Sequence, residues 1–160
     1  MSKHYTKIKM DKTPKISTGI LWILLAGIFG LVAAGVDEGE LKTYGSATIA
    51  VTSIYDGDTF RGNIVGYPAI IGDRISVRVA GIDCPEMRDK RAAVKRKAQE
   101  AKQFTVKRLR EGKKIELLEM RRDKYFRILA RVMIDGQDLG AELIKAGLAK
   151  PYDGGMKAAW

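Results

Sequence analysis

The sequence contains very little histidine and cysteine, two residues on which much enzyme chemistry depends. Among its 160 residues there is one cysteine, Cys84, so no disulfide can form within the chain. The one histidine, His4, lies close to the N-terminus. Histidine-based triads, cysteine–histidine pairs and histidine-ligated zinc sites are therefore not expected in the body of the chain. Any catalysis there must use carboxylates, arginine, lysine, tyrosine and a hard metal ion.

Internal repeats and low-complexity tracts are also lacking. Hydrophobic residues make up 46% of the chain and charged residues 30%, which argues against intrinsic disorder and favours one folded domain. Lys and Arg number 29 against 19 Asp and Glu, so the net charge is +10. This balance suits a polyanionic partner, nucleic acid or anionic lipid, but it also suits an ordinary soluble surface.

Charge is absent from residues 16–36, which follow a lysine-rich start of the chain. These 21 residues would form a helix about 30 Å long, which matches the core of a bilayer. The basic flank places the N-terminus in the cytoplasm. Two interpretations stay open: a single anchoring helix, or a signal peptide cleaved near Val32-Ala33-Ala34. A buried core helix is disfavoured because the run has no polar face.

Both interpretations export the rest of the chain, so we expect a protein of the bacterial cell envelope, either membrane-anchored or secreted. The expected divisions are a basic cytoplasmic tail or signal n-region at 1–17, a transmembrane anchor or signal h-region at 18–36, a linker at 37–45 and a folded domain at 46–160. The sequence indicates a membrane contact through the N-terminal segment and no protein partner.

The folded domain is expected to contain short strands and two helices. Strands are predicted at 46–55, 59–65, 75–82, 114–120 and 128–134, and a loop at 66–73. Helices are predicted at 92–110, ending before a C-cap glycine at Gly112, and at 139–149. The first helix has an apolar stripe of Val94, Ala98, Ala101, Thr105 and Leu109. This order predicts an α+β fold that is mainly β: a five-stranded OB-fold-type Greek-key barrel with a helix inserted after the third strand and a short C-terminal helix.

Three polar segments stand out within this domain. The first is Asp56-Gly57-Asp58-Thr59, the second is Arg78 with Asp83-Cys84-Pro85-Glu86, and the third is Asp123-Lys124-Tyr125-Phe126-Arg127. Each segment alone is weak evidence of function, because carboxylates beside Gly and Pro usually mark turns. An EF-hand is not expected at the first segment, since the rest of the calcium loop is missing.

In this order and spacing, the three segments resemble the staphylococcal nuclease family. The similarity extends from about Ala47 to Tyr152 and includes the phrases VTSIYDGDTF, ISVRVAGIDCPE, AKQFTVKRL and AELIKAGLAKPY. The resemblance implies an OB-type barrel and a Ca²⁺-dependent phosphodiesterase, a hydrolase acting on DNA and RNA. It also implies cleavage that leaves 3′-phosphate ends.

The same resemblance implies roles for individual residues. The positions that match metal ligands are Asp58, Asp83 and Cys84, the last through its main-chain carbonyl. The positions that match catalytic groups are Glu86, as general base, and Arg78 and Arg127, which bind the scissile phosphate. The positions that match substrate contacts are Lys124 and Tyr125, at a neighbouring phosphate, and Tyr152, close to a nucleotide-stacking tyrosine. We expect little sequence specificity, because nothing resembles a reader of base edges.

This set of residue types also suits the chemistry without reference to any family. Ca²⁺ takes about 6–8 oxygen ligands, which two carboxylates, a carbonyl, waters and a substrate phosphate can supply. Two guanidinium groups can each bind phosphate oxygens in a bidentate manner, which lysine cannot do.

One departure from the family concerns Phe126, where a glycine is common. If that position requires a positive φ, Phe126 would be strained and Arg127 displaced. We expect instead an ordinary backbone conformation at the start of a strand. Two other functions stay open: a non-catalytic envelope OB-fold module that binds nucleic acid or protein, and a membrane-surface module that uses the basic face of the helix at 92–110.

Overall fold

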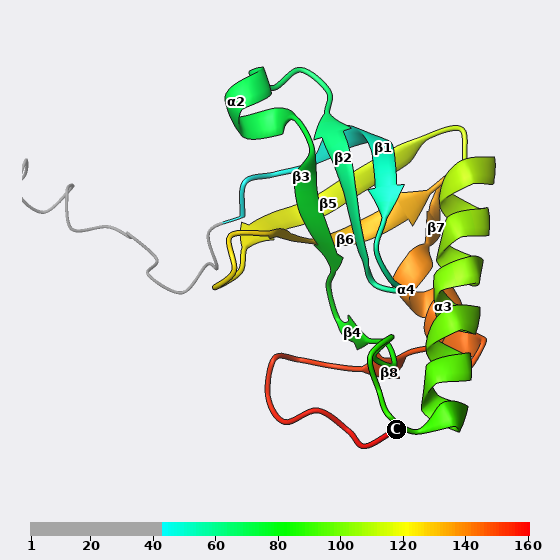
Figure 1. Ribbon diagram of the computed structural model, residues 1–160. Coiled ribbons are helices and arrows are strands. Elements are labelled where there is room, and N and C mark those ends of the chain that lie inside the picture. The colour runs from blue at the N-terminus through cyan, green and yellow to red at the C-terminus, as the bar shows by residue number, and fades with distance from the viewer. Residues whose placement is uncertain (1–42) are drawn as a thin grey trace, which may run out of the picture. The chain divides into compact units, whose positions relative to one another are not determined.

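The protein is described by a computed structural model over residues 43–160, and its centre is a closed barrel of five strands (Figure 1). The barrel strands are β1 (Ala47–Ile54), β2 (Thr59–Ile64), β3 (Ile75–Val79), β5 (Ile115–Arg122) and β6 (Ile128–Ile134). Their order is β3-β2-β1-β5-β6, and a parallel pairing of β3 with β6 closes the barrel. Closure leaves no free edge among these strands. The predicted five-stranded OB-type barrel is therefore confirmed.

The remaining elements lie around the barrel. They are α2 (Ala69–Gly72), β4 (Ile82–Asp83), α3 (Ala92–Glu111), β7 (Gln137–Asp138), α4 (Leu139–Lys145) and β8 (Lys150–Pro151). Strand β4 pairs with β8 in a small separate sheet, and β7 extends the main sheet beside β6. The long helix α3 follows the third barrel strand, as predicted, and runs along one side of the barrel (Figure 1).

Two predicted elements end earlier than expected. The strand predicted at 75–82 stops at Val79, because Gly81 turns the chain with φ 78° before β4 begins. The helix predicted at 139–149 stops at Lys145, and Gly147 follows with φ 67°. The loop predicted at 66–73 contains the short helix α2. The other predicted strands and the helix at 92–110 agree with the structure within two residues at each end.

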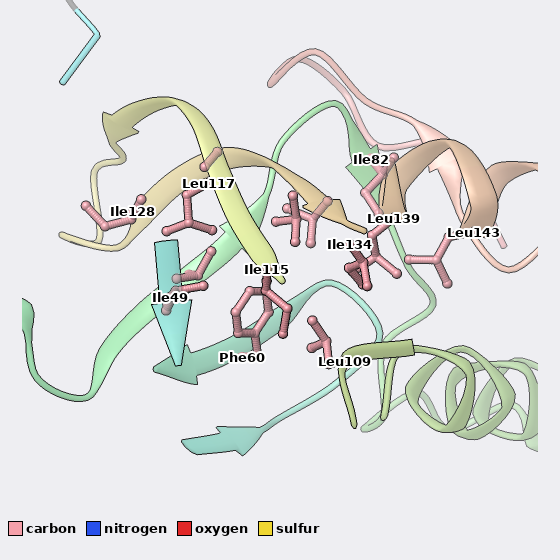
Figure 2. Packing of buried hydrophobic residues seen from close by; sticks show 14 of the residues in the cluster. Ile49, Phe60, Ile82, Leu109, Ile115, Leu117, Ile128, Ile134, Leu139 and Leu143 are labelled. Atoms are coloured by element: carbon pink, nitrogen blue, oxygen red, sulfur yellow. The ribbon is translucent and has the colours of Figure 1, made fainter. Parts of the chain in front are cut away.

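The apolar core fills the barrel and continues under the inner faces of α3 and α4 (Figure 2). Phe60, Leu117 and Ile134 are fully buried in it. Each such side chain contributes roughly 1.5–3 kcal/mol through burial. The buried residues of α3 are the five predicted from its apolar stripe, Val94, Ala98, Ala101, Thr105 and Leu109.

Gly112 caps α3 as predicted, but its conformation is not the left-handed one that usually favours glycine at this place. Its φ is −67°, which any residue can adopt. A Cβ atom here would overlap the side chain of Ile134 in β6. The glycine is therefore required by the close approach of the helix end to the barrel.

The basic tail predicted at 1–17 and the apolar segment predicted at 18–36 lie outside the described residues, as does most of the linker at 37–45. Over residues 43–160, none of the helices has both the length and the apolar character that a membrane crossing requires.

Candidate active site

Asp58 is held almost completely inside the protein by the turn between β1 and β2. Its side chain accepts hydrogen bonds from Thr59 Oγ1 (3.0 Å) and from the main-chain N–H of Cys84 (2.8 Å), and it forms an ion pair with Arg78. Only 1% of the residue is exposed. The N–H of Asp58 is in turn held by the carboxylate of Asp56 at 3.2 Å. The carboxylate is thus fixed from several sides.

The turn that carries Asp58 packs tightly against α3. A Cβ atom on Gly57 would lie 2.8 Å from both Ala101 Cβ and Cys84 Sγ, so no larger residue fits there without movement. Thr105 Oγ1 donates a 2.6 Å hydrogen bond to the Gly57 carbonyl. Helix α3 therefore positions the Asp58 turn through both packing and a buried hydrogen bond.

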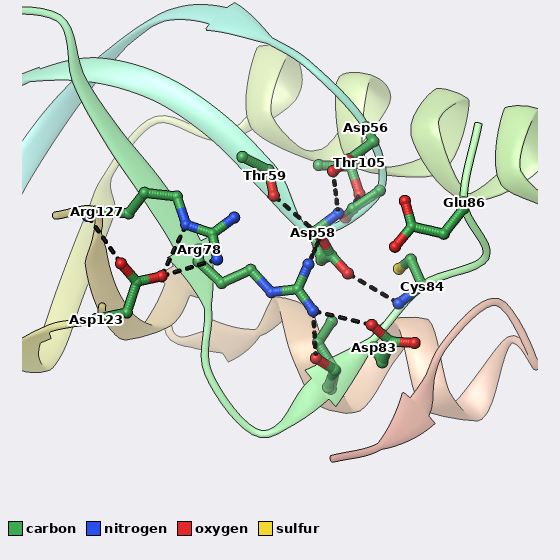
Figure 3. A network of polar contacts seen from close by, with 12 residues as sticks. Asp56, Asp58, Thr59, Arg78, Asp83, Cys84, Glu86, Thr105, Asp123 and Arg127 are labelled. Atoms are coloured by element: carbon green, nitrogen blue, oxygen red, sulfur yellow. Dashed lines mark hydrogen bonds and ion pairs between the residues drawn. The ribbon is translucent and has the colours of Figure 1, made fainter. Parts of the chain in front are cut away.

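Arg78 lies near the end of β3 and joins two carboxylates (Figure 3). Its guanidinium pairs with Asp58 and with Asp83 Oδ1 at 3.1 Å, and it also donates to the Ile82 carbonyl at 3.2 Å. Burial would lower the pKa of Arg78, but the two carboxylates outweigh this effect and raise it. The guanidinium is consequently a permanent positive charge between two acidic groups.

The pKa of Asp58 reflects this buried setting. Burial raises it to about 7, although the charge of Arg78 and the Cys84 N–H both favour the ionised form. Removing a carboxylate from water is costly enough to exceed the attraction of one buried partner. Additional positive charge near Asp58 would therefore stabilise the ionised form of its carboxylate.

The second polar segment runs through β4 into the loop before α3. Asp83 is 4% exposed, and Cys84 is buried beside it. Burial raises the pKa of the Cys84 thiol, so this group stays protonated at neutral pH and is a poor nucleophile. Glu86 projects outward, with 65% of its side chain exposed, and its Oε1 lies 2.9 Å from Lys157 Nζ. The same Nζ lies 2.9 Å from Asp83 Oδ1.

The third segment forms the turn between β5 and β6, and Asp123 organises it. The Asp123 carboxylate accepts from the N–H groups of Tyr125 and Arg127 (2.9 Å each) and pairs with the Arg127 guanidinium at 2.7 Å. Arg127 is thereby held by its Nε and Nη2, while Nη1 has no protein partner within residues 43–160. Tyr125 is 67% exposed.

Phe126 corrects one expectation. Its φ is 65°, so the position does require the left-handed conformation, and an ordinary strand conformation was the wrong prediction. Arg127 is nevertheless not displaced. The Asp123 carboxylate binds both the main-chain N–H and the guanidinium of Arg127 and so keeps the residue in place. Phe126 is 79% exposed, and its ring lies near the Arg122 guanidinium.

The structure brings most of the predicted residues to one end of the barrel, although they come from distant parts of the chain. Figure 3 shows Arg78, Asp58, Asp83, Cys84 and Glu86 close together, with Arg127 and Asp123 facing them from the turn between β5 and β6. Tyr152 lies beside Gly81, to whose carbonyl it donates its N–H at 2.9 Å, and its hydroxyl bonds within its own segment to the Gly155 carbonyl. Lys124 lies next to Tyr125, with its Nζ 5.3 Å from the ring centre.

The donors at this site suit a hard cation better than a soft one. In the part of the chain that the structure describes, no three His, Cys, Asp or Glu side chains gather closely enough to hold a metal ion alone. Within residues 43–160, Asp58 and Asp83 are the two buried carboxylates. Any ion bound by them would need main-chain carbonyls, waters or substrate oxygens as well. Because burial disfavours the ionised form of Asp58, a divalent cation would be a fitting partner.

Sequence reasoning missed several residues of this arrangement. Thr105 is predicted only as part of the apolar stripe, although a buried hydroxyl on such a stripe needs a partner and is therefore a signal of the hydrogen bond to Gly57. Asp123 belongs to the third polar segment, which carries no predicted role for it, and it is the partner of Arg127. Lys157 carried no signal in the sequence, because its contacts with Asp83 and Glu86 depend on how the final segment folds back.

Comparison with known proteins indicates the family to which the chain belongs. The family model described as staphylococcal nuclease homologue matches residues 76–158. The thermonuclease of Staphylococcus hyicus is 30% identical over 142 residues, which is 85% of this chain and 80% of that protein. The probable endonuclease LCL3 of Pyricularia oryzae is 35% identical over 127 residues, 64% of this chain and 48% of the relative. The probable endonuclease C19F8.04c of Schizosaccharomyces pombe is 31% identical over 138 residues, 72% of this chain and 60% of the relative.

The chain spans about half the length of the LCL3 relatives that it matches. The bacterial thermonuclease is covered over most of its length, and the family model covers more than half of this chain. Together with the closed barrel, these matches show that the chain belongs to the staphylococcal nuclease family.

Proposed function

We propose that this protein is a calcium-dependent nuclease that hydrolyses phosphodiester bonds of DNA and RNA with little sequence specificity. The observation that carries the proposal is the pair of buried carboxylates, Asp58 and Asp83, joined by Arg78 next to the outward-facing Glu86. Membership of the nuclease family and the nuclease names of its relatives support the same activity.

Calcium would be held by the Asp58 and Asp83 carboxylates and the main-chain carbonyl of Cys84. Bound calcium would supply charge that polarises a phosphoryl oxygen. The protein's own contribution is to keep two carboxylates fixed where water cannot freely solvate them: Asp58 is 1% exposed and Asp83 is 4% exposed. Substitution of either with Ala should weaken calcium activation.

The arginines have different parts in this proposal. Arg78 is already rigid, since Asp58 and Asp83 hold it, and it would meet the negative charge that develops on the phosphate. Arg127 is oriented by Asp123 and keeps Nη1 for a phosphate oxygen. Glu86 would accept the proton of the attacking water, and the exposure of its side chain gives that water access. Cleavage of the bond between phosphorus and the 5′ oxygen would leave a 3′-phosphate end.

Lys124, Tyr125 and Tyr152 would contact the flanking parts of the strand. Lys124 and Tyr125 lie on the exposed turn next to Arg127, where a neighbouring phosphate would pass. Contacts to phosphate release counterions, so binding of DNA should weaken as salt increases. Little discrimination between sequences is expected from such contacts.

The N-terminal residues add a proposal about location. We propose that the apolar run at 16–36 directs the nuclease domain out of the cytoplasm of a bacterial cell, as a membrane-anchored or a secreted protein. Fractionation of cells that express the full chain tests this: an anchored protein stays in the membrane fraction at full mass, and a cleaved one appears smaller outside it.

The activity is tested with the full-length chain in a non-ionic detergent. Single- and double-stranded DNA and RNA are incubated with Ca²⁺ or with EGTA, beside Glu86→Gln, Arg127→Ala and a Lys145→Gln control at an exposed position on α4. Degradation should require Ca²⁺, and Arg127→Ala should lower turnover by about 10²–10³ without loss of the fold. Wild-type turnover in Arg127→Ala would remove that residue from the proposed site. Binding of DNA without cleavage by a folded wild-type protein would favour the non-catalytic module instead.

A further inference from the structure

The final segment of the described chain, residues 153–160, crosses from the end of β8 to the start of α3, and we call it the strap (Figure 1). It contains no helix or strand. Its beginning is fixed by Tyr152, whose N–H bonds to the Gly81 carbonyl at 2.9 Å, next to β4. The strap therefore starts beside the strand that carries Asp83.

The other end of the strap is fixed by Trp160. Its ring lies 4.7 Å from Lys150 Nζ and 5.7 Å from Lys97 Nζ, measured to the ring centre. Its main-chain oxygen accepts a 2.6 Å hydrogen bond from Arg91 Nη1, and the carbonyl of Ala159 accepts from Lys150. A cation over an indole face is attracted by the negative charge density of the ring. The strap is thus tied down at both ends.

Between these two ends, the strap places one ammonium group on the carboxylates of the candidate active site. Lys157 Nζ lies 2.9 Å from Asp83 Oδ1 and 2.9 Å from Glu86 Oε1. Asp83 Oδ1 also receives Arg78 Nη2 at 3.1 Å, so one oxygen has two cationic partners. The Lys157 side chain is 48% exposed, so it can move into solvent without breaking a packed core.

We propose that Lys157 is a built-in counter-ion that competes with a divalent cation for the Asp83 carboxylate, so that the strap lowers the calcium affinity of the site. The inference rests on the proposed calcium-dependent function. An ammonium and a divalent cation repel one another and seek the same oxygens, so binding of one must weaken that of the other. Lys157 then leaves Asp83 and Glu86 when calcium binds, and Glu86 is freed to act.

Calcium affinity is the readout that tests this competition, measured by isothermal titration calorimetry on the full-length chain in detergent without nucleic acid. Lys157→Gln should lower the Kd for Ca²⁺ about tenfold, because calcium no longer has to displace the lysine from Asp83 and Glu86. Each of these ion pairs involves a half-exposed lysine and is worth a factor of about two to five. Lys157→Arg keeps the charge and should retain the wild-type Kd within about a factor of two. Lys145→Gln removes an equal charge from α4 and should also leave the Kd unchanged.

A second variant acts on the strap without touching Lys157. Trp160→Ala frees the far end of the strap and should lower the Kd about threefold in the wild-type background, because the charge of Lys157 is held less firmly. The same substitution should have no effect when combined with Lys157→Gln. This dependence would not arise if Trp160 only stabilised the fold.

The possible outcomes distinguish a failure of the proposed competition by Lys157 from a failure of the proposed calcium site. Equal calcium affinity in the wild type and in Lys157→Gln, or weaker binding by Lys157→Gln, overturns the competition and leaves the proposed function standing. An effect of Trp160→Ala that persists in the Lys157→Gln background overturns the role of the strap. Absence of calcium binding in every variant, the wild type included, overturns both the competition and the calcium-dependent function.

Discussion

The buried carboxylate of Asp58 leads to a prediction about stability that needs no substrate. Burial raises its pKa from 3.8 to about 7 in the folded protein. One pKa unit corresponds to about 1.4 kcal/mol, so ionised Asp58 costs the folded state on the order of 4 kcal/mol. Asp58→Asn keeps the shape of the side chain and removes the charge. The variant should therefore have a higher free energy of unfolding than the wild type wherever Asp58 of the wild type is ionised.

The direction of the pH dependence follows from the order of the two pKa values. The folded pKa lies above the unfolded one, so the cost is absent below about pH 4 and complete above about pH 7. Asp58→Asn should match the wild type at about pH 4 and exceed its free energy of unfolding by on the order of 4 kcal/mol at about pH 8. In between, the difference should grow steadily.

Urea unfolding followed by circular dichroism measures this difference, with the full-length chain in detergent and EGTA present throughout. Asp123→Asn is a matched control, because the pKa of Asp123 shifts in the opposite direction to that of Asp58. Burial acts to raise the pKa of Asp123, but hydrogen bonds from Arg127 and Tyr125 outweigh it and lower the pKa. Ionised Asp123 thus stabilises the fold, and its Asn variant should lose stability most at high pH and least at low pH.

Two results would refute this reasoning about Asp58. One is an Asp58→Asn variant that is less stable than the wild type at about pH 8, which would mean that the attraction of Arg78 exceeds the cost of burial. The other is a stability difference that stays constant between about pH 4 and pH 8, which would mean that Asp58 does not change its pKa on folding.

Three further substitutions test how the site is held together, each by urea unfolding of the full-length chain. Phe126→Gly should stabilise the protein by roughly 0.5–1 kcal/mol, because glycine adopts the positive φ of this exposed position without the steric cost of a Cβ atom. A loss of stability would show that contacts of the Phe126 ring contribute more than this steric cost. Gly57→Ala should destabilise it by about 1–3 kcal/mol, since the new methyl group would meet Ala101 and Cys84, and a neutral effect would contradict this tight packing. Thr105→Val should cost about 1–3 kcal/mol by leaving a buried carbonyl without its donor; an unchanged midpoint would show that water replaces the hydroxyl.

Much of the fold was predictable because its signals are local. The stripe of Val94, Ala98, Ala101, Thr105 and Leu109 has the period of a helix, and the same residues form the buried face of α3. The Asp56-Gly57 turn and the strands on either side of it are also encoded by neighbouring residues. The order of the three polar segments was sufficient to indicate the family.

Backbone conformation at individual positions was less predictable. Phe126 adopts a positive φ because the Asp123 carboxylate binds the N–H groups on either side of it, which no pattern of residue types reveals. Gly112 looked like a left-handed cap, yet the neighbouring Ile134 explains the glycine instead. In both cases a contact made in the folded state decides the local structure.

The sequence by itself determined which residue types are present for catalysis, the helix and strand periods and the order of the motifs, because these properties depend on residues close together in the chain. Only the tertiary structure decided that Arg78 pairs with Asp58, 20 residues away, and that Lys157 reaches Glu86, 71 residues away. These ion pairs form because barrel closure and the folded-back strap bring distant charges into contact, and periodicity carries no information about such distances.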